Sequence, residues 1–98
     1  MEYIADLQAK YDLRNDFYKK AKLYRDKNII YLKSYNTLVA EYNTKTNKIK
    51  VYGWYSQTTA RHINEFLELY GFDKATKEQM NNKEYWEVWK WLMIKKKT

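Results

Sequence analysis

The single histidine of the chain, His62, closely follows the hydroxyl residues Ser56, Thr58 and Thr59. A hydroxyl beside an imidazole is the pair that a nucleophile and its general base require. Such a site also needs an acidic group that orients the base and donors that stabilise an oxyanion, and no Gly-rich elbow or oxyanion loop accompanies these residues. We therefore predict that the protein is not an enzyme and that one of the three hydroxyls caps a helix instead.

Metal binding is the second chemistry that His62 could serve. Glu65 follows three residues later and could share a helical face with it. A His-x-x-Glu pair without a second histidine or a carboxylate cluster gives weak support for a metal, and the absence of cysteine removes thiolate ligands. We predict no metal site and no cofactor. We expect His62 to lie at the border of the core, with its ring bonded to a backbone group.

Basic and aromatic residues are interleaved between Lys48 and Tyr55, and the formal net charge of the chain is +7. Rings that stack on bases and lysines that contact phosphates are what a surface for single-stranded nucleic acid needs. The alternative, which we favour at this domain size, is that the rings fill the buried faces of a small sheet. The candidate binding patch consists of Lys45, Lys48, Lys50, Tyr52, Trp54, Lys95, Lys96 and Lys97.

A β-hairpin over about 36–55 would position most of this patch. Apolar and polar residues alternate in both arms, which is the spacing of a pleated strand. The polar run between Asn43 and Lys48 supplies the turn, because its asparagines tolerate left-handed backbone conformations. An extended run that starts at Ile29 leads into the first arm.

An amphipathic helix over 59–70 follows the hairpin, with a cap at Ser56, Thr58 or Thr59 and Gly71 at its C-terminal end. The residues of its apolar face are Ala60, Ile63, Phe66, Leu67 and Tyr70. A second, longer helix is predicted over 2–26. There the apolar stripe follows the helical period, and acidic residues precede basic ones in the order that complements the helix dipole.

The C-terminal part contains a capping box, Thr76 to Gln79, and a Trp-rich segment over 85–94. Periodicity in that segment favours a helix. A two-stranded hairpin, however, needs a third strand for stability, and Trp, Tyr and Val favour sheet. We assign 85–94 as the third strand.

These elements predict an α+β fold in which a small antiparallel sheet packs with the helices over 2–26 and 59–70. With 98 residues, the chain is the size of one domain. Its parts are the N-terminal helix in 1–28, a hairpin and helix core in 29–71, and a Trp-rich segment with a basic tail in 72–98. No stretch has the length of a membrane span or the order of a signal peptide, so we expect a cytoplasmic protein without a membrane partner.

The segments SYNTLVAEYN and GWYSQTTARHINEFL resemble a pattern in small uncharacterised proteins of phages, prophages and plasmids of low-GC Gram-positive bacteria. The resemblance implies a mobile-element accessory protein, and it carries no known activity. We therefore predict a stoichiometric binder of a host protein or ribonucleoprotein complex, such as an inhibitor of a CRISPR or restriction nuclease. The alternative is a basic accessory or regulatory protein that binds nucleic acid. No feature of the sequence predicts an oligomeric state.

Overall fold

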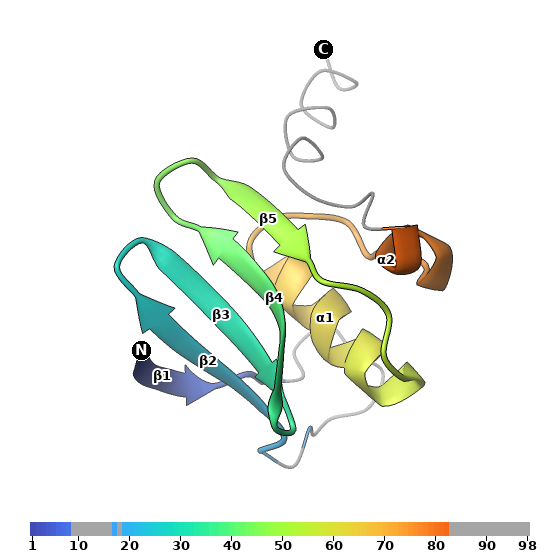
Figure 1. The fold of residues 1–98 in the computed structure, drawn as a ribbon, viewed down its shortest axis with the longest axis horizontal. Coiled ribbons are helices and arrows are strands. Elements are labelled where there is room, and N and C mark those ends of the chain that lie inside the picture. Colours follow the sequence, from blue (N-terminus) through green and yellow to red (C-terminus); the bar gives the residue numbers. More distant parts are fainter. Residues whose placement is uncertain (9–16, 18, 83–98) are drawn as a thin grey trace.

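In the computed structural model of the protein, the described residues are 1–8, 17 and 19–82. Their centre is a five-stranded antiparallel sheet with the strands in sequence order, β1-β2-β3-β4-β5 (Figure 1). The strands are β1 (Glu2–Asp6), β2 (Ala21–Asp26), β3 (Ile29–Ser34), β4 (Thr37–Asn43) and β5 (Lys48–Val51). Two helices follow, α1 (Gln57–Leu69) and α2 (Lys77–Asn82).

Left-handed residues close the turns between neighbouring strands. Lys27 in the β2–β3 turn has φ 57°, Tyr35 in the β3–β4 turn has φ 56° and Asn47 in the β4–β5 turn has φ 60°. The Asn43 side-chain oxygen accepts hydrogen bonds from the backbone N–H groups of Lys45 and Thr46 at 2.9 and 3.0 Å. The asparagines therefore shape the β4–β5 turn in the way that the sequence predicts.

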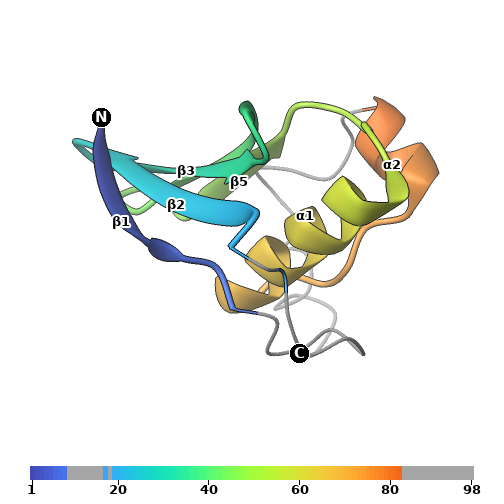
Figure 2. The ribbon, with the colours of Figure 1, turned by 90° about the horizontal axis from the view of Figure 1, so that it is seen from below.

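Helix α1 lies against one face of the sheet, and Figure 2 shows the two layers edge-on. Leu32, Ile49 and Val51 from the sheet are almost fully buried against Ile63 and Phe66 from the helix. These positions follow the period of two in the strands and the spacing of three to four in α1, which brings the apolar side chains of both elements into one core. In Figures 1 and 2, α1 lies on this side of the sheet, while α2 lies beside the edge strand β5.

Both ends of α1 have the capping groups that the sequence predicts. Ser56 is the N-cap residue, and its hydroxyl accepts a hydrogen bond from the Thr59 backbone N–H at 3.1 Å. Gly71 follows the helix with φ 87° in the left-handed region. At α2, the Thr76 hydroxyl accepts from the Gln79 backbone N–H, and the Gln79 side chain accepts from the Thr76 backbone N–H. The predicted capping box is thus confirmed.

The predicted long N-terminal helix over 2–26 is wrong. Residues 2–6 and 21–26 are the strands β1 and β2, which pair with each other. In β2 the buried side chains of Ala21 and Leu23 alternate with the partly exposed side chains of Lys22 and Tyr24, which is the period of a strand. Backbone pairing with β1 and β3 on both sides satisfies the polar groups that a helix would pair internally.

The sheet is also larger than the predicted hairpin with one added strand. The extended run at Ile29 is a separate strand, β3, because the chain reverses at Tyr35 before β4 begins. The second arm of the hairpin ends at Val51 and does not continue to residue 55. The strand predicted at 85–94 lies outside the described residues.

Candidate functional site

A row of aligned residues crosses all five strands on the face of the sheet that lies opposite α1. The strand register places Tyr3 beside Tyr24, Tyr24 beside Tyr31, Tyr31 beside Glu41 and Glu41 beside Lys50. Side chains of neighbouring strands in such a row lie side by side, because paired residues project to the same face. The sheet therefore gathers three tyrosines from three strands on one surface.

Four tyrosines and three lysines form this surface, which we call the tyrosine face. Its residues are Tyr3, Tyr24, Tyr31, Tyr52, Lys22, Lys33 and Lys50. Figure 1 shows the sheet in front of α1, so that this face is turned toward the viewer. Tyr3 is 50% exposed, and the side chains of Tyr24 and Tyr31 are partly exposed.

The rings and amines of the tyrosine face contact one another. The rings of Tyr3 and Tyr24 meet edge to face, with centroids 5.7 Å apart and planes at 72°. The Lys33 Nζ lies 5.5 Å from the centre of the Tyr24 ring, and the Lys22 Nζ lies 5.5 Å from that of Tyr3. These geometries are favourable for the ring quadrupole, so the side chains hold one another in place before any partner arrives.

Acidic groups are interleaved with the lysines. The Lys22 Nζ donates to the Asp6 carboxylate at 2.9 Å, and the Tyr3 hydroxyl donates to the same oxygen at 2.8 Å. These two hydrogen bonds, that from Lys22 first, hold the pKa of Asp6 below its usual value, and the bond to Asp6 raises the pKa of Tyr3. The face therefore carries charge of both signs, and Lys22 and Asp6 form an ion pair on it.

The Tyr52 hydroxyl donates to Glu41 at 2.6 Å, which ties the segment after β5 to the centre of β4. Burial raises the pKa of Tyr52 well above its usual value, and the hydrogen bond to Glu41 raises it further. Tyr52 is therefore a neutral donor, and Glu41 is fixed as its acceptor within the row.

The predicted patch is divided by the structure. Lys48 and Lys50 lie on β5 and are exposed on the side of the tyrosine face, Tyr52 follows them, and Lys45 lies in the β4–β5 turn. Trp54 instead packs against the core, where the Lys77 Nζ lies 4.2 Å from its ring centre. The remaining members, Lys95, Lys96 and Lys97, lie outside the described residues.

Sequence reasoning missed the residues of β1, β2 and β3 in this surface. The apolar spacing predicts that Tyr24 and Lys22 belong to the helix over 2–26. It places Tyr31 in the extended run that starts at Ile29, for which the sequence names no pairing strand. The available signal was the alternation in Ala21–Asp26, AKLYRD, followed by a polar pair and then by the β-branched start of β3.

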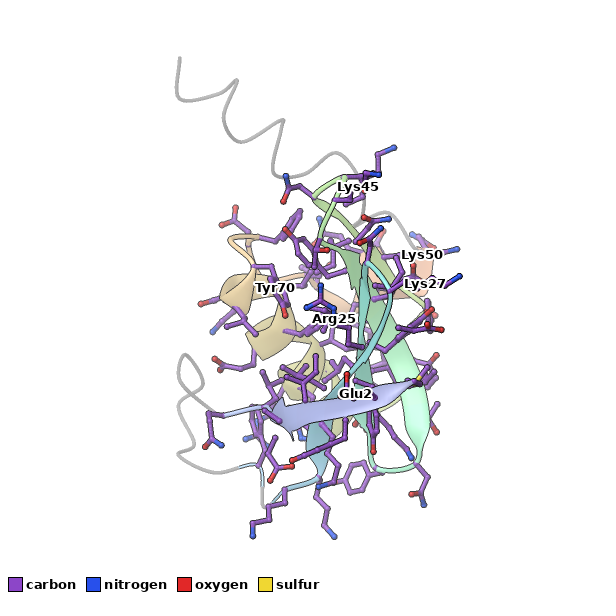
Figure 3. The ribbon with its side chains drawn as sticks, turned by 90° about the vertical axis from the view of Figure 1, so that its left-hand side faces the viewer. Glu2, Arg25, Lys27, Lys45, Lys50 and Tyr70 are labelled. Atoms are coloured by element: carbon purple, nitrogen blue, oxygen red, sulfur yellow. The ribbon has the colours of Figure 1, made fainter. Side chains whose placement is uncertain are left out.

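Two turns with lysines lie at one end of the sheet, next to the tyrosine face. The Thr44 backbone N–H donates to the Asn28 carbonyl at 2.8 Å, and this bond joins the β4–β5 turn to the β2–β3 turn. Figure 3 shows Lys27 and Lys45 at this end, with Lys50 on the outer side of the sheet and Arg25 directed toward Tyr70. We call Lys27, Lys45 and Lys48 the basic turn end.

A second polar cluster lies inside the molecule, between β3 and α1. The Ser34 hydroxyl lies 2.8 Å from the His62 Nδ1 and 2.9 Å from the Thr59 hydroxyl. The ring of Phe17 packs edge to face on His62 at a centroid distance of 4.6 Å. His62 is therefore inside the core rather than at its border as predicted, and its Nδ1 is bonded to the Ser34 side chain.

The chemistry of this cluster is limited by its burial. Ser34 is 2% exposed and His62 is 1% exposed, so a substrate could reach the hydroxyl only if the sheet and α1 separated. Of the hydroxyls weighed as nucleophiles in the sequence, Thr59 belongs to the cluster, while Ser56 caps α1. The arrangement fits a polar connection that fixes α1 on the sheet.

A model of a family described as a family of unknown function (DUF8033) matches residues 5–82. The chain belongs to this family. In this DUF8033 chain, the match includes β2 to β5, both helices, most of the tyrosine face and the cluster at His62. Comparisons with curated proteins and with solved structures find no match.

Membership of DUF8033 agrees with the resemblance to an uncharacterised family, although the match is longer than the two segments that carry the resemblance. An origin in phages, prophages or plasmids stays a prediction. Within residues 1–8, 17 and 19–82, no three His, Cys, Asp or Glu side chains are close enough to hold a metal ion. None of the helices in that same part of the chain has the length and apolarity to cross a membrane.

Proposed function

We propose that the protein is a non-enzymatic binder that recognises a partner protein through the tyrosine face. The observation that supports this most is the row of Tyr3, Tyr24 and Tyr31 on the side of the sheet opposite α1. Tyrosine is enriched in protein interfaces because it buries a large area at a small entropic cost and keeps a hydroxyl for hydrogen bonding. Strand pairing and mutual ring contacts hold these rings ready for a partner.

The charge of the face favours a protein over nucleic acid. Lys22, Lys33, Lys48 and Lys50 lie on this side of the sheet, but Asp6, Asp26 and Glu41 lie there as well. A phosphate backbone would meet these carboxylates, whereas a protein surface can offer charges of both signs. Lys22 is in addition already paired with Asp6.

The narrower form of the proposal names the partner. The resemblance to mobile-element proteins supports an accessory protein of the bacterial cytoplasm that binds a host protein or ribonucleoprotein complex. A CRISPR or restriction nuclease is our best candidate, and the protein would inhibit it by occupying a surface rather than by chemistry. This form rests on the sequence resemblance, while the general form rests on the tyrosine face.

A single-stranded nucleic acid is the second candidate ligand. The basic turn end favours it, because Lys27 and Lys45 lie in two turns at one end of the sheet and Lys48 begins β5, the strand that carries Lys50 of the tyrosine face. This candidate predicts a ligand that crosses the tyrosine face and continues over the two turns.

Affinity capture from a lysate of a low-GC Gram-positive bacterium, with and without nuclease treatment, tests the proposal. We expect a protein partner that survives nuclease and is captured in a fixed ratio. A variant with Tyr24→Thr and Tyr31→Thr should lose it, because threonine keeps the strand propensity but removes the rings. Tyr35→Asn is the matched control, since it removes an exposed ring from a turn where asparagine suits the left-handed backbone. Loss of every partner after nuclease treatment would favour nucleic acid.

A further inference from the structure

A cleft of about 530 Å³ lies between α1, the segment after β5 and the start of α2. Trp54 forms one wall, Ala60 and Ala75 add apolar surface, and Lys77 and Arg61 bring positive charge. Gln57 and Asn64 supply side-chain amides. The volume is in the range of sites for small ligands.

Neighbouring groups fix the side chains of this cleft. The Lys77 Nζ lies 4.2 Å from the centre of the Trp54 ring, and the capping box at Thr76 sets the start of the helix that carries Lys77. The Asn64 side-chain oxygen accepts a hydrogen bond from the Ala75 backbone N–H at 2.7 Å. Because its oxygen is used in this bond, Asn64 offers the cleft its amide nitrogen, which is a donor.

The lining can donate hydrogen bonds and attract negative charge. Lys77 and Arg61 carry one positive charge each, and none of the described lining residues is acidic. The guanidinium carbon of Arg61 lies 5.4 Å from the centre of the Phe17 ring, which is not among the lining residues, so Lys77 is the cation on which the test below relies. An anion placed here would gain charge-assisted hydrogen bonds, and an attached flat ring would pack on Trp54 and the alanines.

We propose that this cleft binds a small organic anion in which a phosphate or carboxylate is attached to a flat ring. A nucleoside monophosphate and an aromatic carboxylate share this chemistry. The site goes beyond the proposed function, because the cleft is lined by α1, the segment after β5 and α2, and none of its lining residues belongs to the tyrosine face, which lies on the side of the sheet opposite α1 (Figure 2).

Titration of the full-length, isotope-labelled protein with adenosine 5′-monophosphate, followed by NMR, tests the site. We expect saturable shifts of the Trp54 indole N–H and of the Asn64 side-chain amide, with a Kd below about 1 mM. Lys77→Gln should weaken binding by about tenfold or more, because it removes a charge-assisted contact. Lys74→Gln removes the same charge from an exposed lysine outside the cleft, and it should change the Kd by less than about twofold.

Parallel titrations with 4-hydroxybenzoate, inorganic phosphate and adenosine separate the parts of the ligand. Shifts at Trp54 with 4-hydroxybenzoate but not with the nucleotide would support the site and assign it to carboxylates. If inorganic phosphate bound as tightly as adenosine 5′-monophosphate, the ring would contribute nothing to binding. If adenosine bound as tightly as the nucleotide, the anion would contribute nothing. Either result would overturn the proposal. Absence of saturable shifts with both ring-bearing anions, or equal weakening by Lys74→Gln, would overturn it as well. The amide spectrum of each variant shows whether it remains folded.

Discussion

The Ser34 hydroxyl lies 2.8 Å from the His62 Nδ1, and this bond joins the last residue of β3 to the second turn of α1. Both side chains are buried, and the Thr59 hydroxyl completes the cluster at 2.9 Å from Ser34. Sheet and helix are thus connected by polar groups inside an apolar core. Buried hydrogen bonds of this kind fix one arrangement of two elements, because any other arrangement leaves the groups unsatisfied.

Ser34→Ala should lower the free energy of unfolding by about 1 to 3 kcal/mol, because it removes a partner from two buried polar groups. Chemical denaturation measures this change. Thr46→Ala is the control, since Thr46 is exposed and an exposed substitution should stay within about 0.5 kcal/mol. Equal stability of wild type and Ser34→Ala would contradict the structural role.

His62→Gln should lower stability and leave partner binding nearly intact, because His62 is buried on the helix side of the sheet and away from the tyrosine face. Binding is measured at a temperature where circular dichroism shows the variant to be folded. Complete loss of binding by the folded variant would assign His62 a direct role in function.

Ser56→Ala should cost about 1 kcal/mol of stability, because the Ser56 hydroxyl accepts from the Thr59 backbone N–H at the start of α1. Thr58→Ala is the control, since Thr58 lies inside the first turn and does not cap it. An unchanged melting temperature for Ser56→Ala would mean that the cap contributes nothing to folding.

The Asp6 carboxylate should make stability depend on acid pH. Its pKa in the folded protein lies below the usual value, because Lys22 and Tyr3 donate hydrogen bonds to the ionised form. The unfolded chain therefore binds this proton more readily, and the contribution of Asp6 is complete above about pH 5 and is lost as the pH falls toward its folded pKa. We expect the stability difference between wild type and Asp6→Asn to shrink from about pH 6 to about pH 2. A constant difference over that range would contradict the pairing.

Binding to oligonucleotides should be weak at physiological salt if the partner is a protein. Non-specific contacts give a Kd above about 1 μM there, and the affinity falls steeply with salt because each phosphate contact releases counterions. The measurement compares wild type with the triple variant Lys45→Ala, Lys48→Ala and Lys50→Ala. A Kd well below about 1 μM that is lost in the triple variant would overturn the preference for a protein.

The hairpin and the helix after it could be predicted because their signals are local. The β4–β5 turn contains Asn43 and Asn47, which are residues that turns favour, and α1 has a capping hydroxyl and a terminal glycine. The strands predicted from these signals lie near β4 and β5, and the helix predicted over 59–70 lies near α1.

The other strands could not be predicted in the same way because their turns are hidden. Lys27 and Tyr35 adopt left-handed backbone conformations that these residue types rarely take, so the sequence gives little sign of chain reversal at either point. Without a sign of the reversals, the short alternation in Ala21–Asp26 does not outweigh the helical spacing of the apolar residues in 2–26. Pairing of Tyr24 with Tyr31 depends on that reversal and not on local propensity.

The candidate site was predictable only in part for the same reason. Lys48, Lys50 and Tyr52 could be assigned to one strand and its continuation, and the structure places them beside the tyrosine face. Tyr24 and Tyr31 enter the surface through strands that the sequence did not reveal. Trp54 was placed with Tyr52 because both fit one alternating arm, but β5 ends at Val51 and the chain then turns toward α1.

The affinity of the captured partner for variants of the tyrosine face tests the central claim most directly. Isothermal titration should show that Tyr24→Thr with Tyr31→Thr weakens binding by about thirtyfold or more, since one aromatic hot-spot residue at the centre of an interface is already worth about 2 kcal/mol or more. Tyr35→Asn should change the Kd by less than about threefold. Unchanged affinity of the folded double variant would contradict recognition through this face.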